Sequence, residues 1–335
     1  MTRRALQALA FCAAVALLFF LPRWISDFRA SQLAYVALFL VALLGLGILT
    51  GFSGQISLGH GAFMAIGAYT TAVLVSHHVM RDVWTIPLAG LLAGAVGYIV
   101  GIPALRLSGP YLALATFGIG VATPQVIRKW ESLTKGDTGI GFDLPHARFG
   151  LHLTPNDWLY YLCWTVAAVL FLVAWLLVGS RFGRTLRALR DSEVAAVSSG
   201  ISLPLWKTAA FAISAFYAGV AGSLYALASL SYVSPGSYDV DLSIRLFVGV
   251  VVGGLGSLWG LVAGAAFIEF LEIYAASLLH QLERLFHFAV NEKAQGVSSV
   301  VYGVVLILLM LVLPGGAGQL LRAGGRLTTR LYNRS

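Results

Sequence analysis

The chain has 335 residues, of which 59% are hydrophobic and 11% are charged, whereas soluble domains average about 45–50% and about 25%. Apolar runs long enough to cross a bilayer, about 17–25 residues each, recur throughout, and no polar block between them could fold as a soluble domain. The composition predicts an all-α polytopic membrane protein with a single transmembrane domain over residues 1–335. It excludes a soluble enzyme, and the net charge of +8 is expected in membrane loops rather than on a nucleic-acid-binding surface.

Ten apolar segments are expected to form about ten spans, including broken or re-entrant helices. The first resembles a signal peptide because Arg3 and Arg4 precede an apolar core. That core is longer than the usual length of about 7–15 residues and no clear cleavage site follows it, so we expect an uncleaved span. The segments run approximately over residues 5–21, 33–50, 61–79, 84–105, 110–127, 157–179, 208–230, 243–256, 258–279 and 297–313.

Residues 51–69, GFSGQISLGHGAFMAIGAY, place glycines and small polar groups between two apolar runs. Irregular polar backbone at membrane depth is tolerated only where protein buries it or where it lines a wet cavity. Glycine-interrupted segments are also typical of transport pathways. We therefore predict a broken helix beside a substrate pathway, although a hydrogen-bonded structural role is an equal alternative for the histidine. The predicted pathway residues of this stretch are Gly51, Gly54, Gln55, Ser57 and His60.

The distribution of charge predicts the orientation of the chain. If the N-terminus is cytoplasmic and the spans alternate, the cytoplasmic side holds 12 basic and 2 acidic residues, and the outer side holds 10 of each. Basic residues favour the cytoplasmic side of short loops. Both termini and residues 180–207 are therefore predicted to be cytoplasmic, and residues 128–156 to be a periplasmic loop.

Residues 180–207 are the most charged stretch of the chain. Arg184, Arg187 and residues 188–196 keep helical spacing, Gly200 fits a helix C-cap, and Pro204 fits a stop signal. We predict one short amphipathic helix that lies across the cytoplasmic face. The alternative is a basic loop that only orients the protein in the membrane.

The eighth apolar segment is short, and glycines at 253, 254 and 256 separate it from the ninth, which favours a half-helix or a re-entrant segment. Residues 254–267 faintly echo residues 54–63, either as an internal repeat or by chance. On the ninth segment Glu269 and Glu272 share one helix face. These acids either line the pathway and meet a substrate ammonium group, or lie near the outer interface.

Four sequence blocks together resemble the LivM-type permease subunits of branched-chain amino acid ABC importers. Residues 51–63 are similar to the signature G-x-x-G-Q-x-S-L-G-H-x-A-F, and residues 106–117 to R-x-x-G-x-Y-x-A-x-x-T-L/F. Residues 134–140 resemble T-x-G-x-x-G-I/L, and residues 253–260 resemble G-G-x-G-S-x-x-G. The resemblance covers nearly the whole chain, with small departures at Pro110 and Lys135. It adds Tyr111 and Thr116 to the predicted pathway residues.

The charged loop also resembles a known docking element. Its pattern E-x-A-A-x-x-x-G is similar to the E-A-A loop of ABC importer permeases, which docks into a groove on an ATPase subunit. The resemblance implies that small alanines allow close approach, while the acid and the arginines fix the register. The residues expected to couple to the ATPase are Arg184, Arg187, Asp191, Glu193, Ala195, Ala196 and Gly200.

The resemblance implies a bacterial inner-membrane transport subunit that is not itself an enzyme. Its implied partners are a homologous permease in a heterodimer, two ATPase subunits, a periplasmic substrate-binding protein and membrane lipid. ATP would bind the partner subunits, because no G-x-x-x-x-G-K-[ST] motif occurs here. We expect no catalytic residue, metal site or cofactor in this chain. Within the family, the alternative substrates are another amino acid, urea or a short-chain amide; outside it, the alternative is an ion-driven secondary transporter or a channel.

Overall fold

The computed structural model describes residues 26–104, 107, 109–142, 154–229 and 232–286. The predicted first and tenth segments and both chain termini lie outside the described residues. The described part is mainly helical, with one short antiparallel sheet that pairs Ile140 with Val233. The elements are α2 (Asp27–Leu46), η2 (Gly47–Phe52), α3 (His60–Ser76), α4 (Asp82–Ala104), α5 (Pro110–Lys129), α6 (Glu131–Thr134), η3 (Gly136–Thr138), β1 (Ile140–Gly141), α7 (Pro155–Gly179), α8 (Arg181–Asp191), α9 (Glu193–Ser198), α10 (Leu203–Ala228), β2 (Tyr232–Val233), η4 (Pro235–Tyr238), α11 (Val240–Gly253) and α12 (Leu258–Phe286).

Every predicted apolar segment within the described ranges forms a helix, which confirms the all-α membrane fold. The eighth segment is α11, which has only 14 residues, as expected of a half-helix. The apolar stretch at the start of α12 and the whole of α3 are also too short to count as full spans. Five described helical stretches are long and apolar enough to cross a membrane: Asp27–Phe52, Asp82–Pro103, Pro110–Lys129, Pro155–Gly179 and Leu203–Ala228.

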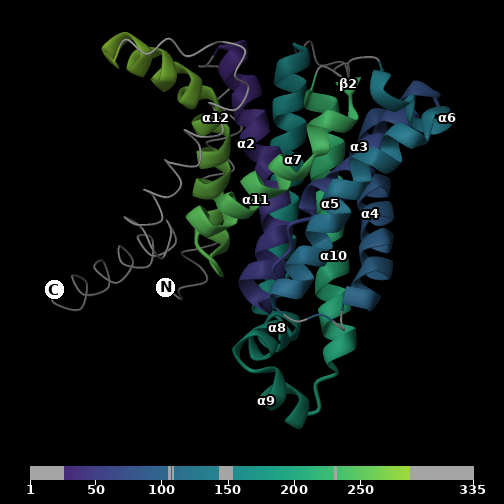
Figure 1. Cartoon of the computed structure of the whole chain (residues 1–335), viewed down its shortest axis with the longest axis vertical. Helices are drawn as coiled ribbons and strands as arrows, with labels where there is room; N and C mark the ends of the chain where they lie inside the picture. The colour runs from purple at the N-terminus through teal and green to yellow at the C-terminus, as the bar shows by residue number, and fades with distance from the viewer. Residues whose placement is uncertain (1–25, 105–106, 108, 143–153, 230–231, 287–335) are drawn as a thin grey trace.

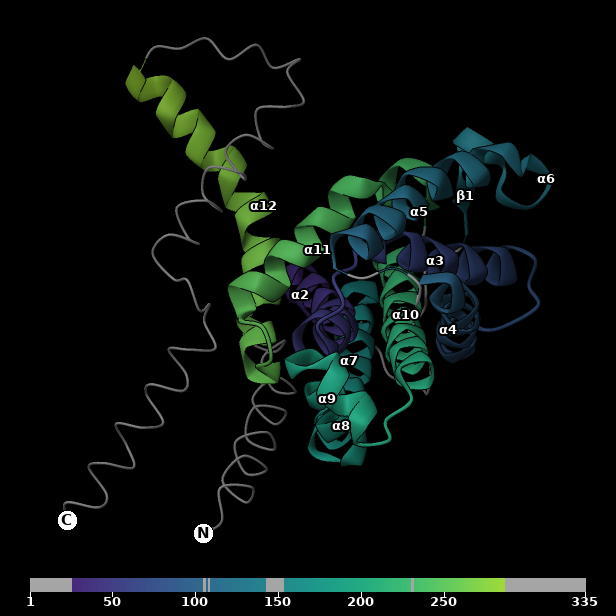
Figure 2. The same ribbon diagram turned by 60° about the horizontal axis from the view of Figure 1, so that its bottom comes forward.

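Helices α2 and α10 form the centre of the bundle (Figures 1 and 2). α2 packs against α7, α10 and α12, and α10 also packs against α3 and α4. In the most apolar part of α2 with η2, 89% of the residues are buried, compared with 28% in α5 and 22% in α7. The two central helices are therefore enclosed on most sides, with 78% burial in α10, whereas α5 and α7 keep an apolar face outward, as expected of helices at the membrane boundary.

Glycines bring α10 into backbone contact with its two neighbours. A Cβ atom at Gly67 of α3 would overlap the carbonyl of Gly219, and one at Gly222 would overlap the carbonyl of Met64. On the other side of α10, a Cβ at Gly219 would collide with Ala93 of α4. Small residues permit this close approach between membrane helices. We call the contact of α3, α10 and α4 the glycine layer.

The short elements gather at the two ends of the bundle (Figure 1). Helices α8 and α9 lie together at one end, which we call the α8 end. The opposite end carries α6 and the β1–β2 sheet, and we call it the α6 end.

The prediction of a single helix within residues 180–207 is wrong, because the loop holds two helices, α8 and α9. The chain is extended at Ser192, whose hydroxyl accepts a hydrogen bond from the Ala195 amide and caps α9. Gly200 has a φ of 81°, which fits the predicted helix end. Pro204 lies in the first turn of α10, where its missing N–H removes no helical bond, so it starts a helix rather than stopping one.

Candidate functional site

The predicted break lies between α2 and α3. α2 runs into the π-helix η2, residues 54–59 have no regular helical structure, and α3 begins at His60. Gly54 has a φ of 74°, a conformation that residues with a Cβ rarely adopt. π-helical turns are rare and are frequently found at functional sites. The sequence-based prediction of a glycine-broken helix is confirmed.

Hydrogen bonds inside the stretch satisfy most of its polar groups. Thr50 Oγ1 donates to the Gln55 carbonyl at 3.1 Å, and Ser53 Oγ donates to the Leu49 carbonyl at 2.6 Å. Gln55 Nε2 donates to Ser53 Oγ at 2.9 Å, and the Gln55 side chain is buried. These groups therefore stabilise the break itself, and in this conformation they face protein rather than a wet passage.

Ser57 is buried without a hydrogen-bond partner among the described residues. His60 is also buried, and its imidazole lies beside the backbone carbonyl of Ala42, which can accept a hydrogen bond from it. The predicted pathway residue Thr116 is buried as well, but its Oγ1 accepts a hydrogen bond from the Leu58 amide at 3.0 Å. None of the three lines either cavity described below. A buried unpaired polar group costs about 1–3 kcal/mol. Ser57 is therefore the group of the stretch whose hydrogen-bonding capacity is unused among the described residues in this conformation.

A second break separates α11 from α12, and it touches the first. Gly254 and Gly256 have φ values of 96° and 82°. A Cβ at Gly51 would lie 2.9 Å from the amide nitrogen of Gly256, so only glycine fits at this contact. The internal repeat remains a prediction, but the two stretches that suggested it meet at one junction.

Helix α8 reaches this junction through Arg190, in its last turn. The guanidinium of Arg190 donates a hydrogen bond to the Gly51 carbonyl. Its Cγ lies 3.1 Å from the position of a Cβ at Gly54. Leu186 and Leu189 are buried on the inner side of α8 and anchor the helix. The loop thus contacts the first break through both packing and a charge-assisted hydrogen bond.

Lys207, near the start of α10, makes a second connection between the loop and the break. Lys207 Nζ pairs with Glu193 Oε1 of α9 at 2.6 Å. Gln55 Nε2 lies 3.5 Å from the carbonyl oxygen of Lys207, at the long limit of a hydrogen bond. The predicted pathway residue Gln55 and the predicted coupling residue Glu193 are therefore connected through one lysine.

The exposed surface of α9 is more apolar than expected for a loop outside a membrane. Val194 and Val197 are 79% and 51% exposed, and their i, i+3 spacing places them on one face. Ala196 is only 3% exposed and packs in the core, so in this conformation its side chain is not available on the surface, and its role in coupling stays a prediction. The other predicted coupling side chains of the two helices are exposed: Arg184, Arg187, Asp191, Glu193 and Ala195.

The T-x-G-x-x-G block shapes the α6 end. Thr134 Oγ1 donates to the Ile127 carbonyl at 2.6 Å and accepts from the Gly136 amide at 3.3 Å. Gly139 has a φ of 68°, and a Cβ there would overlap the carbonyl of Val233 on the paired strand. The block therefore builds the turn between α6 and β1, and the sheet that follows packs on α3.

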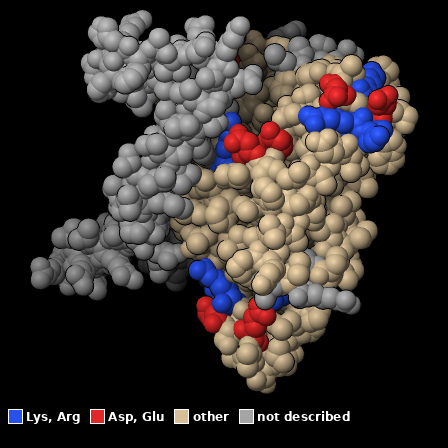
Figure 3. All heavy atoms as spheres, viewed as in Figure 1, with Lys and Arg blue, Asp and Glu red and all other residues tan. Residues whose placement is uncertain are grey.

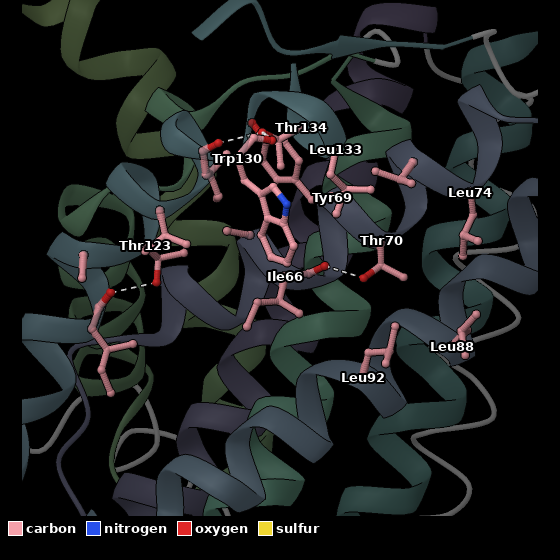
Figure 4. Close-up of a pocket in the computed structure, with 16 residues that line it drawn as sticks. Ile66, Tyr69, Thr70, Leu74, Leu88, Leu92, Thr123, Trp130, Leu133 and Thr134 are labelled. Carbon is pink, nitrogen blue, oxygen red and sulfur yellow. Dashed lines mark hydrogen bonds between the residues drawn. The ribbon is translucent and has the colours of Figure 1, made fainter. Parts of the chain in front are cut away.

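An apolar cavity of about 570 Å³ lies beside this turn, between α3, α4, α5 and α6 (Figure 4). Its lining includes Ile66, Leu92 and Trp130, and few polar atoms face the space. The hydroxyl of Tyr69, also in the lining, is buried without a hydrogen-bond partner among the described residues. The charged ends of a free amino acid would lose their hydration here without replacement, so the cavity suits an apolar group.

A smaller cavity of about 250 Å³ contains Glu269 in its wall. This carboxyl group is 9% exposed, which agrees with a lining position and disagrees with a place at an exposed interface. The side chain of Glu272 lies outside the described residues. Tyr111 is 70% exposed on α5 and lines neither cavity. The other residues in the wall of the smaller cavity are Tyr35, Phe39, Tyr225 and Ile273.

Charged side chains separate into two groups on the face shown in Figure 3. One group lies at the α8 end, above its uncharged tip, and the other lies toward the α6 end, with a wide uncharged band between them. Such a band is what the hydrocarbon core of a bilayer requires. No cluster of three or more His, Cys, Asp or Glu side chains suited to a metal ion occurs within the part of the chain that the structure describes.

Sequence reasoning missed Arg190, Lys207 and the exposed valines of α9. The loop pattern holds a partial signal for Arg190, because Gly183, Leu186 and Leu189 recur every third residue and form the buried side of α8. That signal places Arg190 beside the buried side. It does not identify the Gly51 carbonyl as its acceptor, because the two residues are 139 positions apart.

Comparison with known proteins identifies relatives over most of the chain. The family described as branched-chain amino acid transport system / permease component matches residues 29–310. The high-affinity branched-chain amino acid transport system permease protein LivM of Escherichia coli is 36% identical over 90% of this chain and 72% of its own length. LivM of Salmonella typhimurium is 36% identical over 76% of this chain and 64% of its own length. The E. coli permease protein LivH is 24% identical over 82% of this chain and 90% of its own length. No solved structure matches.

Proposed function

This chain belongs to the family of branched-chain amino acid transport permeases, and from that membership we propose that it is the permease subunit of an ABC importer for branched-chain amino acids. The observation that carries the proposal is the 36% identity to E. coli LivM over 90% of the chain. The subunit would lie in the bacterial inner membrane and pair with a homologous permease. Similarity to proteins named LivM and to proteins named LivH supports such a pairing.

In this proposal the α8 end is cytoplasmic and the α6 end periplasmic. Loop residues 180–207 carry a basic excess, which favours the cytoplasmic side. Two ATPase subunits would bind the cytoplasmic end of the permease pair and supply the energy. A periplasmic binding protein would deliver the substrate to the opposite end.

The ATPase docking surface is proposed to be the exposed side of α9 and of residues 184–191 of α8. Val194 and Val197 offer a small apolar contact that water would otherwise cover. Arg184, Arg187 and Asp191 are exposed charged residues on the neighbouring helix α8. Apolar anchors inside a polar rim are the usual pattern of protein interfaces. Ala195 leaves room for close approach beside the valines.

The substrate pathway is proposed to run beside the first helix break. Ser57 carries a buried hydroxyl without a partner among the described residues, and His60 is buried close to it in sequence; a second conformation could offer both side chains to substrate or to water. Glu269 is a further candidate, as the buried acid of the smaller cavity. The uptake experiment distinguishes between the alternative substrates within the family.

Uptake of radiolabelled leucine tests this function. We expect cells that express this chain with its partner subunits to take up leucine, with competition by unlabelled isoleucine and valine. Uptake should stop when ATP is depleted and persist when an ionophore collapses the ion gradients. Competition by urea or a short-chain amide instead would change the assigned substrate, and dependence on the ion gradient would overturn the ABC assignment.

The docking surface is tested by a matched pair of variants. Val194→Glu should reduce ATPase co-purification at least tenfold, because it introduces a charge at the centre of an apolar contact. Val79→Glu makes the same change at a valine that is 68% exposed in the turn between α3 and α4, and it should leave ATPase retention unchanged. Equal retention in both variants would show that α9 is not the docking site.

A further inference from the structure

Arg190 contacts the first helix break and lies close to the second, and the two breaks belong to distant parts of the sequence. Its guanidinium donates to the Gly51 carbonyl at the end of η2. Its aliphatic stem packs on Gly54, where an added Cβ would lie 3.1 Å from Cγ. On the second break, a Cβ at Gly256 would lie 3.5 Å from Nη1 of the same arginine. One side chain of α8 therefore meets the first break at two points and lies close to the second break at a third.

The chemistry of the contact favours arginine. The carbonyl oxygens at the end of a helix lack donors from a following turn, and a cation near a helix C-terminus is stabilised by the helix dipole. A guanidinium presents several N–H donors in one plane and is always charged. A lysine would supply the charge but only a compact donor group, so it would reproduce part of the contact.

The folding of α8 does not depend on this hydrogen bond. The helix has its own N-cap at Ser180, whose side chain accepts from the Phe182 amide, and it buries Gly183, Leu186 and Leu189. Arg190 directly follows Leu189, the last residue of that anchor, and its side chain remains in contact with solvent. Its bond to Gly51 therefore fixes the position of the breaks relative to α8 more than it fixes α8 itself.

We propose that Arg190 is a positioning residue that transmits movement of the α8–α9 loop to both helix breaks at once. The two breaks already touch through Gly51 and Gly256. A displacement of the guanidinium would therefore move the place where both breaks meet. This inference rests on the proposed role of the loop as the ATPase docking element. It adds the residue through which movement caused by ATPase docking is transmitted to the proposed substrate pathway.

The experiment uses the complete complex in liposomes, with purified partner subunits and radiolabelled leucine as the probe. ATP hydrolysis and leucine transport are measured together for Arg190→Gln, Arg190→Lys and the control Arg181→Gln. Arg181 lies on the same helix, is exposed, and its side chain has no recorded interaction within the described part of the chain. Both glutamine variants remove one positive charge from α8.

We expect Arg190→Gln to keep its ATPase subunits and to hydrolyse ATP, while leucine transported per ATP falls at least tenfold. Arg190→Lys should recover part of that ratio, and Arg181→Gln should match the wild type. A wild-type ratio in Arg190→Gln would overturn the proposal, as would loss of its ATPase subunits, which would indicate docking instead. The melting temperature of each variant is measured alongside, and a drop of several degrees at an unchanged transport ratio would also reject it.

Two other results would bear on the proposed function rather than on Arg190. Wild-type complex that transports no leucine would reject the importer assignment. Full ATPase retention in Val194→Glu would reject the docking surface. Neither outcome depends on the arginine, so the failure of each proposal can be recognised separately.

Discussion

The two ends of the molecule differ in how tightly they are packed. At the α8 end, two helix breaks and a loop meet at distances where an added Cβ at Gly51 would lie 2.9 Å from a backbone nitrogen. At the α6 end, four helices leave an apolar cavity of about 570 Å³. Tightly packed regions pass a displacement to their neighbours, whereas loosely packed regions absorb it. The comparison teaches that small changes of sequence should matter far more at the α8 end.

Chemical labelling gives the largest expected contrast between the two ends. With Cys12 and Cys163 replaced by alanine, Ser132→Cys at the α6 end should react with a membrane-impermeant thiol reagent in intact cells. Ser192→Cys at the α8 end should react only after lysis, because the basic loop is expected to be cytoplasmic. The reverse pattern would invert the orientation.

Gly51→Ala should produce the strongest effect of a single methyl group. The added carbon would press on the backbone of Gly256, and overpacking of this kind costs about 1–3 kcal/mol. We expect leucine uptake to fall at least tenfold and the melting temperature in detergent to drop by several degrees. Gly118→Ala is the control, because nothing lies within 4 Å of a Cβ at that glycine of α5. Similar losses in both variants would show that close approach at the breaks is unimportant.

A pair of polar variants separates structure from transport within the first break. Gln55→Ala removes the donor to Ser53, so we expect a loss of stability of about 1 kcal/mol and a several-fold loss of uptake. Ser57→Ala removes a buried hydroxyl without a recorded partner, so its melting temperature should stay constant or rise. If Ser57→Ala nevertheless lowers uptake, the hydroxyl serves substrate or water in another conformation. Normal uptake would leave Ser57 without a pathway role.

The smallest effect is expected in the cavity at the α6 end. Ala122→Leu adds three carbons to the lining of a space that can accept them, so uptake should stay within twofold of the wild type. The melting temperature should be unchanged or slightly higher, because filling an apolar space adds dispersion contacts. A severe loss of uptake with normal stability would show instead that the cavity must remain empty or must bind a ligand.

Much of the fold could be predicted because membrane helices are recognisable in a sequence by their length and apolarity. The glycine-broken stretch at 51–59, the short α11 and the turn after it were also accessible, since glycine has few other reasons to cluster at membrane depth. The single helix predicted for the charged loop failed at Ser192. There a side-chain cap competes with the helical backbone, and spacing alone cannot decide between them.

The candidate site was predictable only in part. The sequence identifies Gly51, Gln55 and Glu193 as members of important stretches. It does not show that the Gln55 side chain hydrogen-bonds within the break instead of facing a passage. It also cannot distinguish Ala195, which is exposed, from Ala196, which is buried. Contacts such as Arg190 with Gly51 depend on how distant segments pack, and no local pattern records that.

The glycine layer determines which helices can shear past one another. The carbonyl of Met64 lies where a side chain at Gly222 would begin, and the carbonyl of Gly219 blocks the same space at Gly67. A slide of α3 along α10 by even a fraction of a helical turn would drive backbone atoms into each other. An interface between helices that are packed this closely does not deform gradually but changes between distinct packing arrangements. The amide hydrogens of α3, α10 and α4 should therefore exchange with deuterium as one slow unit, while those of α5, which lies outside the layer, exchange independently.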